Sequence, residues 1–174
     1  GTPLIGAGDR TPAAISYYSG RGLTPQSAAP DLGGSVSGVT GGSVGGGLWQ
    51  EVYTGIGGDA VSNLTASSKF PWFPDSSTSL TGAASVTNYA DSYGQRWTGW
   101  ITPPQTGNYR FFRTSDDDAE IWLGTTDQPA SAVKILAGVG HTGGERQWSS
   151  AAPSAYIPLV GGQKYYIEVR HKEG

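Results

Sequence analysis

Cysteine and methionine are both absent from this 174-residue sequence, and only 14% of its residues are charged. Without cysteine there are no disulfides, thiolate zinc sites or cysteine nucleophiles. The formal net charge is -3 with no cluster of Lys or Arg, so the basic face that nucleic acid requires is missing. No apolar run approaches the ~20 residues that span a bilayer, and no signal peptide is present. We therefore expect no nucleic-acid binding, no membrane insertion and, since the chain starts at Gly1, a processed protein or a piece of a longer one.

Glycine is abundant, with 28 residues, and aromatic residues make up 11% of the chain. This composition is typical of a β-rich fold with many turns. Residues 19–46 form a Gly/Ser/Thr/Pro-rich stretch with almost nothing to bury, which predicts a linker, or else a coil that packs along a neighbouring surface. From residue 47 onward Trp, Tyr and Phe recur every few residues, which indicates a folded domain over 47–174.

Runs rich in aromatic and β-branched residues, bounded by Gly and Pro, predict strands. They lie at 48–55, 95–104, 108–115, 119–124, 155–160 and 164–171. Pro103 and Pro104 end the second run because proline cannot donate a ladder hydrogen bond. Gly161-Gly162 favours a hairpin between the last two runs. No convincing amphipathic helix is present. We predict an all-β fold, an antiparallel β-sandwich or barrel with long loops and little helix.

The stretch RWTGWITPPQTGNYRFFRTSDDDAEIWLG (96–124) resembles the core of the PA14 domain family. The shared pattern is an aromatic strand, a T-P-P-x-T-G-x-Y turn, a strand ending in S-D-D and a strand carrying I-W-L. Agreement extends to GLWQEVYTGIGGDAVSNLT (47–65) and IPLVGGQKYYIEVRHKEG (157–174). The resemblance implies the family's β-sandwich or barrel over about 47–174, of the type found in bacterial adhesins and glycosidases. Members also occur in toxins and surface lectins, so the family alone does not give a function.

The resemblance stops before the family's final strand, of the type GDNLAVAW, which would follow HKEG. GDRTPAAISYY (8–18) is similar to that strand. The resemblance therefore implies that residues 1–18 complete the sheet, either within the same chain, as in a circular permutant, or in a neighbouring subunit by β-strand addition. Addition to a neighbour would propagate head to tail into a fibre, and tandem repeats would show the same order of segments. The remaining alternative is a truncated chain with a chance match.

Three consecutive carboxylates, Asp116, Asp117 and Asp118, occur in a chain with few charges. Calcium prefers six to eight oxygen ligands, largely carboxylates and carbonyls. In the lectins that this sequence resembles, two vicinal aspartates joined by a cis peptide bind Ca2+, and the ion holds sugar hydroxyls. The matching residues here are Asp116 and Asp117. Alternatively, the aspartates accept backbone N–H bonds in a turn. Asp118 is expected to face solvent, and Asp9 and Asn88 are further candidate ligands.

Aromatic rings in loops would favour sugar binding, since pyranose faces stack on them. Trp72 in KFPWFPD and Trp148 in ERQWSS are the candidate sugar contacts; the alternative is that both pack under their loops. Trp97, Trp100 and Trp122 lie in predicted strands and are expected in the core.

Catalysis is not expected from this sequence. A glycosidase needs two carboxylates about 5–10 Å apart across a cleft, and adjacent aspartates in one loop do not provide that geometry. No G-x-S-x-G, P-loop or H-E-x-x-H motif is present. His171 is expected in a turn after the last predicted strand, in a structural role.

These observations predict a non-catalytic module, extracellular or at the cell surface, that binds a glycan or polysaccharide through Ca2+ as part of an adhesin or surface fibre. The alternative hypothesis is a purely structural filament subunit or tandem repeat, joined to its neighbours through residues 1–18 and without a ligand. A third is an accessory domain of a large hydrolase.

Overall fold

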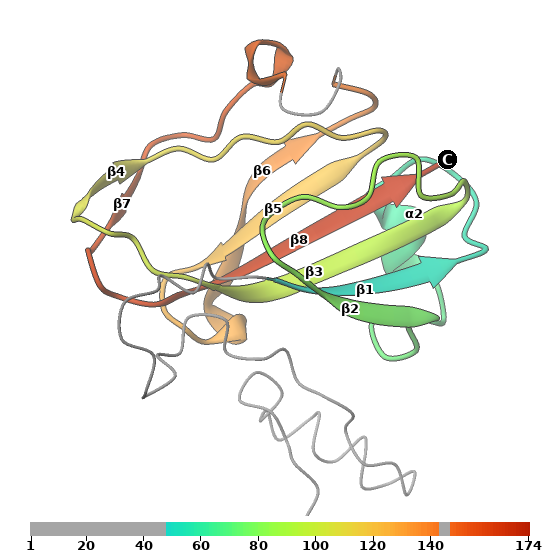
Figure 1. Cartoon of the computed structure of the whole chain (residues 1–174), viewed down its shortest axis with the longest axis horizontal. Helices are drawn as coiled ribbons and strands as arrows, with labels where there is room; N and C mark the ends of the chain where they lie inside the picture. The colour runs from blue at the N-terminus through green and yellow to red at the C-terminus, as the bar shows by residue number, and fades with distance from the viewer. Residues whose placement is uncertain (1–47, 143–146) are drawn as a thin grey trace, which may run out of the picture.

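A computed structural model of the protein describes residues 48–142 and 147–174, and its strands form two antiparallel sheets (Figure 1). The larger sheet has the strand order β2-β1-β3-β8-β5-β6, and β4 pairs with β7 in the smaller one. The strands are β1 (Leu48–Thr54), β2 (Ser76–Leu80), β3 (Tyr93–Ile101), β4 (Gly107–Tyr109), β5 (Ala119–Gly124), β6 (Ala132–Gly138), β7 (Ile157–Leu159) and β8 (Tyr165–Glu173). Helical structure is limited to α2 (Val61–Ala66) and the 3-10 turns η1 (Pro129–Ser131) and η2 (Trp148–Ser150) in the described chain. The predicted antiparallel all-β fold with little helix is confirmed.

One face of the large sheet carries the main core. Cross-strand partners point to the same face of a sheet, and Val169 pairs with both Trp97 and Ile121, so these three side chains share a face. The buried residues of this core are Leu48, Ile121, Leu123, Leu159, Tyr165 and Ile167. Leu159 comes from β7, and Tyr109 of β4 packs against the same cluster, so the small sheet covers this face as the second layer of a sandwich.

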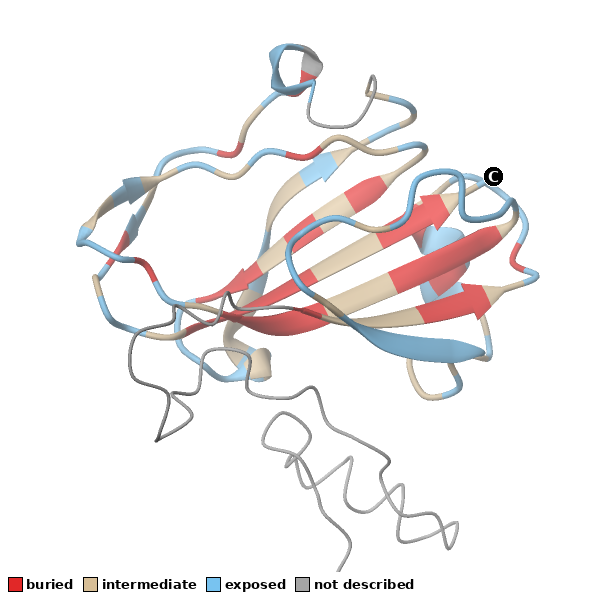
Figure 2. Cartoon of the chain, viewed as in Figure 1, coloured by how far each residue is buried: buried red, intermediate tan, exposed pale blue. Residues whose placement is uncertain are grey.

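The helix α2 covers the opposite face of the sheet at the end where β3 begins and β8 ends. Leu64 of the helix and Tyr53 of β1 are both fully buried in a second cluster. Leu64 lies so close to β3 that a Cβ on Gly94 would be 2.7 Å from its Cδ1 atom. Burial is concentrated along the central strands and falls off on the edge strand β2 (Figure 2). The sheet is therefore buried on both faces at the end where β3 and β8 meet α2.

Several predicted elements differ from the structure. The run predicted at 108–115 is a strand only at its start, in β4. The strand predicted at 95–104 is β3, which begins two residues earlier and ends at Ile101, before the two prolines. The hairpin predicted at Gly161-Gly162 is wrong, because β7 pairs with β4 while β8 pairs with β3 and β5. The two positions require glycine for a different reason. Gly162 has a φ of 76°, and a Cβ on Gly161 would lie 2.8 Å from the Thr106 nitrogen.

Other predictions concern parts of the chain outside the described residues. The completing strand at 1–18, the linker at 19–46 and the candidate ligand Asp9 fall there. Among the described residues, no helix is long and apolar enough to cross a membrane.

Candidate functional site

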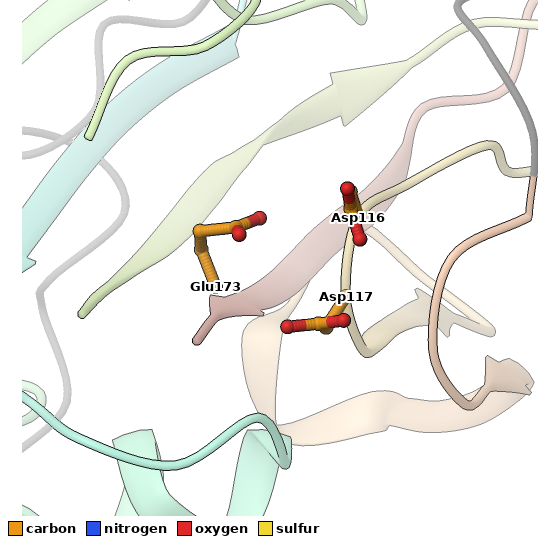
Figure 3. Close-up of side chains that lie close together, drawn as sticks. All are labelled: Asp116, Asp117 and Glu173. Carbon is orange, nitrogen blue, oxygen red and sulfur yellow. The ribbon is translucent and has the colours of Figure 1, made fainter. Parts of the chain in front are cut away.

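Asp116, Asp117 and Glu173 converge at one end of the large sheet (Figure 3). Glu173 is the last residue of β8, and the two aspartates come just before β5. Ala119 pairs with His171 in the ladder between β5 and β8, so the chain before β5 runs beside the end of β8. One carboxylate oxygen from each residue lies within 4.8 Å of the others. The structure thus adds Glu173 to the pair predicted from sequence.

The loop that carries the two aspartates is held by hydrogen bonds from its neighbours. The Ser115 backbone N–H donates to Thr142 Oγ1 at 2.9 Å, and Ser115 Oγ donates to the Asp117 carbonyl at 2.7 Å. The buried Arg113 donates through Nη1 to Ser115 Oγ. The peptide bond between Asp116 and Asp117 is cis, as the resemblance implies. The loop backbone is therefore positioned by contacts on several sides.

His171 fixes the Asp116 carbonyl from the neighbouring strand. It was expected in a turn, but it lies within β8 and is buried. Gln95 Nε2 lies 3.1 Å from His171 Nδ1, and because an amide nitrogen only donates, Nδ1 accepts. His171 Nε2–H then donates to the Asp116 carbonyl. Burial lowers the pKa of His171, which agrees with a neutral ring in this role.

Negative charge accumulates at this end of the sheet. The pKa of Glu173 is raised, first by burial and then by the nearby carboxylates of Asp116, Asp117 and Asp91, while Lys172 opposes the shift. Ionised carboxylates this close repel one another, and the repulsion disfavours the ionised form. A cation among them would remove this penalty.

Asp59 and Lys172 complete the surroundings of the acidic group. A Cβ on Gly174 would lie 2.4 Å from Asp59 Oδ1 and 3.0 Å from Asp117 Oδ2, so both carboxylates border the same glycine. Lys172 is fully buried and donates through Nζ to the Glu173 carbonyl. Burial lowers the pKa of Lys172, and the negative charges of Asp59, Glu173 and Asp117 act in the opposite direction. We call Asp59, Asp91, Asp116, Asp117 and Glu173 the acidic cluster.

The remaining predicted residues lie in different places. Asp118 does not face solvent freely: it is partly buried, and its Oδ1 accepts the Gly140 N–H at 2.7 Å. Asn88 is exposed in the segment before β3, with a φ of 52°. Trp72 is half-buried and lies in the segment that connects α2 to β2. Trp148 is 48% exposed, and its ring centroid is 6.3 Å from that of Phe112, which leaves part of the indole open.

The three strand tryptophans divide between core and surface. Trp100 is buried as predicted, and its Nε1 donates to the Asp127 carbonyl at 2.8 Å. Trp97 is half-buried against the main core. Trp122 is also half-buried, with the Arg170 guanidinium 4.5 Å from its ring centroid. The core prediction thus holds fully only for Trp100.

Sequence reasoning missed Asp59, Asp91 and Glu173. They lie far apart in the chain, in loops before α2 and β3 and at the end of β8. Only the pairing of β8 with β3 and β5 brings them near the aspartate loop, and nothing in the local sequence of each one marks it as a ligand.

Comparison with known proteins identifies relatives of this chain. The family model of the PA14 domain matches residues 75–174. A mouse protein named N-acetyl-beta-glucosaminyl-glycoprotein 4-beta-N-acetylgalactosaminyltransferase 1 is 36% identical over 124 residues, which are 67% of this chain and 12% of that protein. Canine fibrocystin is 29% identical over 86 residues, which are 44% of this chain and 2% of fibrocystin. The chain therefore spans a small part of the curated relatives it matches.

Among solved structures, the A domain of epithelial adhesin 9 from Candida glabrata, in complex with Galb1-3GlcNAc, has a TM-score of 0.47 and 13% identity, with 73% of this chain and 75% of that chain covered. A beta-glucosidase from Kluyveromyces marxianus, in complex with glucose, has a TM-score of 0.42 and 16% identity, with 72% and 14% covered. The family model covers more than half of the chain and includes the S-D-D loop and the end of β8. The protein belongs to the PA14 domain family.

Proposed function

We propose that this protein is a non-catalytic, extracellular or cell-surface carbohydrate-binding module in which Ca2+, held by Asp116, Asp117 and Glu173, holds a glycan. The observation that carries the proposal is the convergence of these three carboxylates within 4.8 Å. Membership of the PA14 family and a relative that is named as a glycoprotein-modifying transferase support the glycan as ligand.

The donor atoms fit calcium. Ca2+ takes six to eight oxygen ligands in a flexible geometry, including carboxylates and carbonyls, and the acidic cluster supplies only oxygen. The pKa of Glu173 is raised first by burial and then by repulsion from the neighbouring carboxylates, and a bound divalent cation would favour the ionised form against both effects. Bound calcium would supply a positive centre with open coordination positions for sugar hydroxyls. The protein side chains would hold the ion, and His171 would hold the Asp116 backbone through its carbonyl.

A binding role fits the cluster better than hydrolysis does. A glycosidase places its two carboxylates about 5–10 Å apart on either side of the scissile bond. Here the three carboxylates come within 4.8 Å of one another on one side of the sheet, where they suit a shared cation. We expect no release of reducing sugar from glycans that the protein binds, even after prolonged incubation; a measurable turnover that Asp117→Asn abolishes would contradict the non-catalytic role.

The test is calorimetric titration of calcium into metal-stripped protein, followed by a glycan array with and without calcium. Extracellular modules bind calcium with Kd values of about 10⁻⁴–10⁻³ M, and we expect a value in this range. Asp116→Asn and Asp117→Asn should each abolish calcium binding and glycan binding together. The control is Asp127→Asn, the same change at an exposed loop residue whose Oδ1 accepts from the neighbouring Gln128 side chain. Glycan binding that persists in chelator would refute the role of calcium.

A second candidate function, strand complementation in a filament, is favoured by an open edge beside β4. Phe111 and Ser115 accept backbone hydrogen bonds from Ser154 and Thr142. In the part of the chain that the structure describes, the backbones of Arg110, Phe112 and Thr114 make no such bonds. An extended segment could pair there, as β-strand addition requires.

The occupant we propose for this edge is the segment 8–18, from the same chain, a neighbouring subunit or a preceding repeat. Light scattering of the full chain against a chain lacking residues 1–18 tests the intermolecular form. Oligomers that grow with concentration and disappear on truncation would support a filament. A full chain that stays monomeric at all concentrations would contradict it.

A further inference from the structure

A recess lies on the same face of the large sheet as His171, between β1, β2 and the segment that precedes β3. Its volume is about 190 Å³, room for about six water molecules at ~30 Å³ each. Side chains from β1, β2 and β3 form its floor, and the segment 81–92 forms one wall. The residues that matter for its chemistry are Gln50, Ser76, Thr78, Val86, Tyr89 and Gln95. We call it the amide pocket.

The floor of the amide pocket is rigid. Gln95 is 1% exposed, and all its polar atoms are used. Its Oε1 accepts from Trp97 Nε1 at 2.8 Å and from Gln50 Nε2. Its Nε2 donates to Tyr93 Oη and His171 Nδ1, both at 3.1 Å. These partners fix the orientation of the Gln95 amide.

Gln95 in turn holds the side-chain amide of Gln50, which also lines the pocket. One of its N–H groups points to Gln95 Oε1, which leaves its Oε1 and its second N–H. Within residues 48–142 and 147–174, no hydrogen bond from these two groups is found. An oriented amide with one acceptor and one donor left is suited to a hydroxyl, which donates and accepts at once.

The walls combine apolar surface with hydroxyl groups. Tyr89 is 47% exposed, and its ring centroid lies 5.2 Å from that of the buried Tyr93. Val86 is 70% exposed. Ser76 and Thr78 add hydroxyls from β2, and the lining contains no Asp, Glu, Lys, Arg or His. Uncharged hydrogen-bonding groups beside an aromatic face match an uncharged sugar ring, which has apolar faces and a rim of hydroxyls.

The amide pocket is linked to the acidic cluster. Gln50, Gln95, His171 and the Asp116 carbonyl form a continuous hydrogen-bonded chain. β1 and β5 are three strand spacings apart in the sheet, about 14 Å. An oligosaccharide of several rings reaches over that distance, whereas a single ring does not.

We propose that the amide pocket is a second saccharide subsite, which binds an uncharged ring of the same glycan that calcium holds at the acidic cluster. The proposal rests on the proposed function and deepens it, because it makes the ligand a neutral oligosaccharide rather than a monosaccharide. The residues that line the pocket are different from those of the acidic cluster, so we expect its own affinity to be independent of calcium.

The test is an array of neutral mono-, di- and trisaccharides in millimolar calcium. We expect Gln50→Ala and Tyr89→Ala each to weaken binding of the longest ligands about tenfold. Both should leave calcium affinity and calcium-dependent monosaccharide binding at the acidic cluster unchanged, because neither side chain belongs to that cluster. Tyr156→Ala is the matched control, since this tyrosine is 67% exposed outside the pocket. Thermal melts confirm that each variant is folded. Trisaccharide binding by both pocket variants at wild-type strength would overturn the proposal.

If wild-type protein binds no arrayed glycan, the proposed function fails, and the subsite is tested separately. D-glucose and D-galactose are titrated to 100 mM into chelator-treated protein while the side-chain amide resonances of Gln50 and Gln95 are followed by NMR. Saturable shifts that Tyr89→Ala removes would support the subsite alone. Unshifted amide resonances would overturn it.

Discussion

Glu173→Gln should change stability in opposite directions with and without calcium. In the metal-free protein, burial and the neighbouring aspartates raise the pKa of Glu173. A carboxyl whose folded-state pKa is raised destabilises the fold once pH rises above that value. At pH 7 the neutral glutamine removes this penalty, so the metal-free variant should melt at a higher temperature than the wild type.

With calcium the order should reverse. Binding to the folded state stabilises by RT ln(1 + [Ca2+]/Kd), about 2.7 kcal/mol at a hundredfold excess over Kd. Unfolding entropy of about 2.1 cal/mol/K per residue gives about 0.27 kcal/mol/K for the 127 residues that remain when the first 47 of 174 are left out. The wild-type Tm should therefore rise by about 10 °C in excess calcium. The variant lacks one ligand and should rise by much less.

The assay is differential scanning calorimetry of both proteins at pH 7, in chelator and in calcium at a hundred times the Kd found by calorimetric titration, with Asp127→Asn as the control for loss of one exposed carboxylate. The reasoning is refuted if the wild-type Tm does not respond to calcium. It is also refuted if Glu173→Gln lowers the Tm in chelator, because the side chain would then stabilise the metal-free fold.

Two further predictions concern the fold around the site. Asp75 accepts from Lys69 at 2.7 Å and from the Thr54 N–H, and these bonds lower its pKa from 3.8 to about 2. Because both charged side chains are more than a third exposed, we expect these contacts to contribute about 1 kcal/mol to the free energy of unfolding. The contribution is present above pH ~4 and is lost as pH falls through 2. Acid titration of Asp75→Asn should lack this loss of stability. Gly94→Ala places a Cβ 2.7 Å from Leu64 Cδ1 and should lower the free energy of unfolding by about 1–3 kcal/mol, measured by urea denaturation. The double variant with Leu64→Ala should lose less stability than the two single variants added together. Additive costs would contradict the clash.

The local sequence was sufficient to predict the strands that lie in the sheet interior. β1, β5 and β8 combine aromatic and β-branched residues with bounding glycines or charges, a composition that packs well on a pleated, buried surface. β2 has the sequence SSTSL and is largely exposed, so it carries no hydrophobic signal. It forms a strand because its backbone pairs with the edge of β1. The six residues of α2 are too few for a helical period to be recognised.

The sequence by itself determined the all-β class and the family, and it marked Asp116 and Asp117 as the candidate pair, because each of these depends on residues close together in the chain. Only the tertiary structure decided that Glu173 joins this pair, since its position depends on β8 lying between β3 and β5. The amide pocket likewise depends on β1 and β3 placing Gln50 beside Gln95. Contacts of this kind join residues 45 or more positions apart, and they follow from strand order and register, which local composition does not specify.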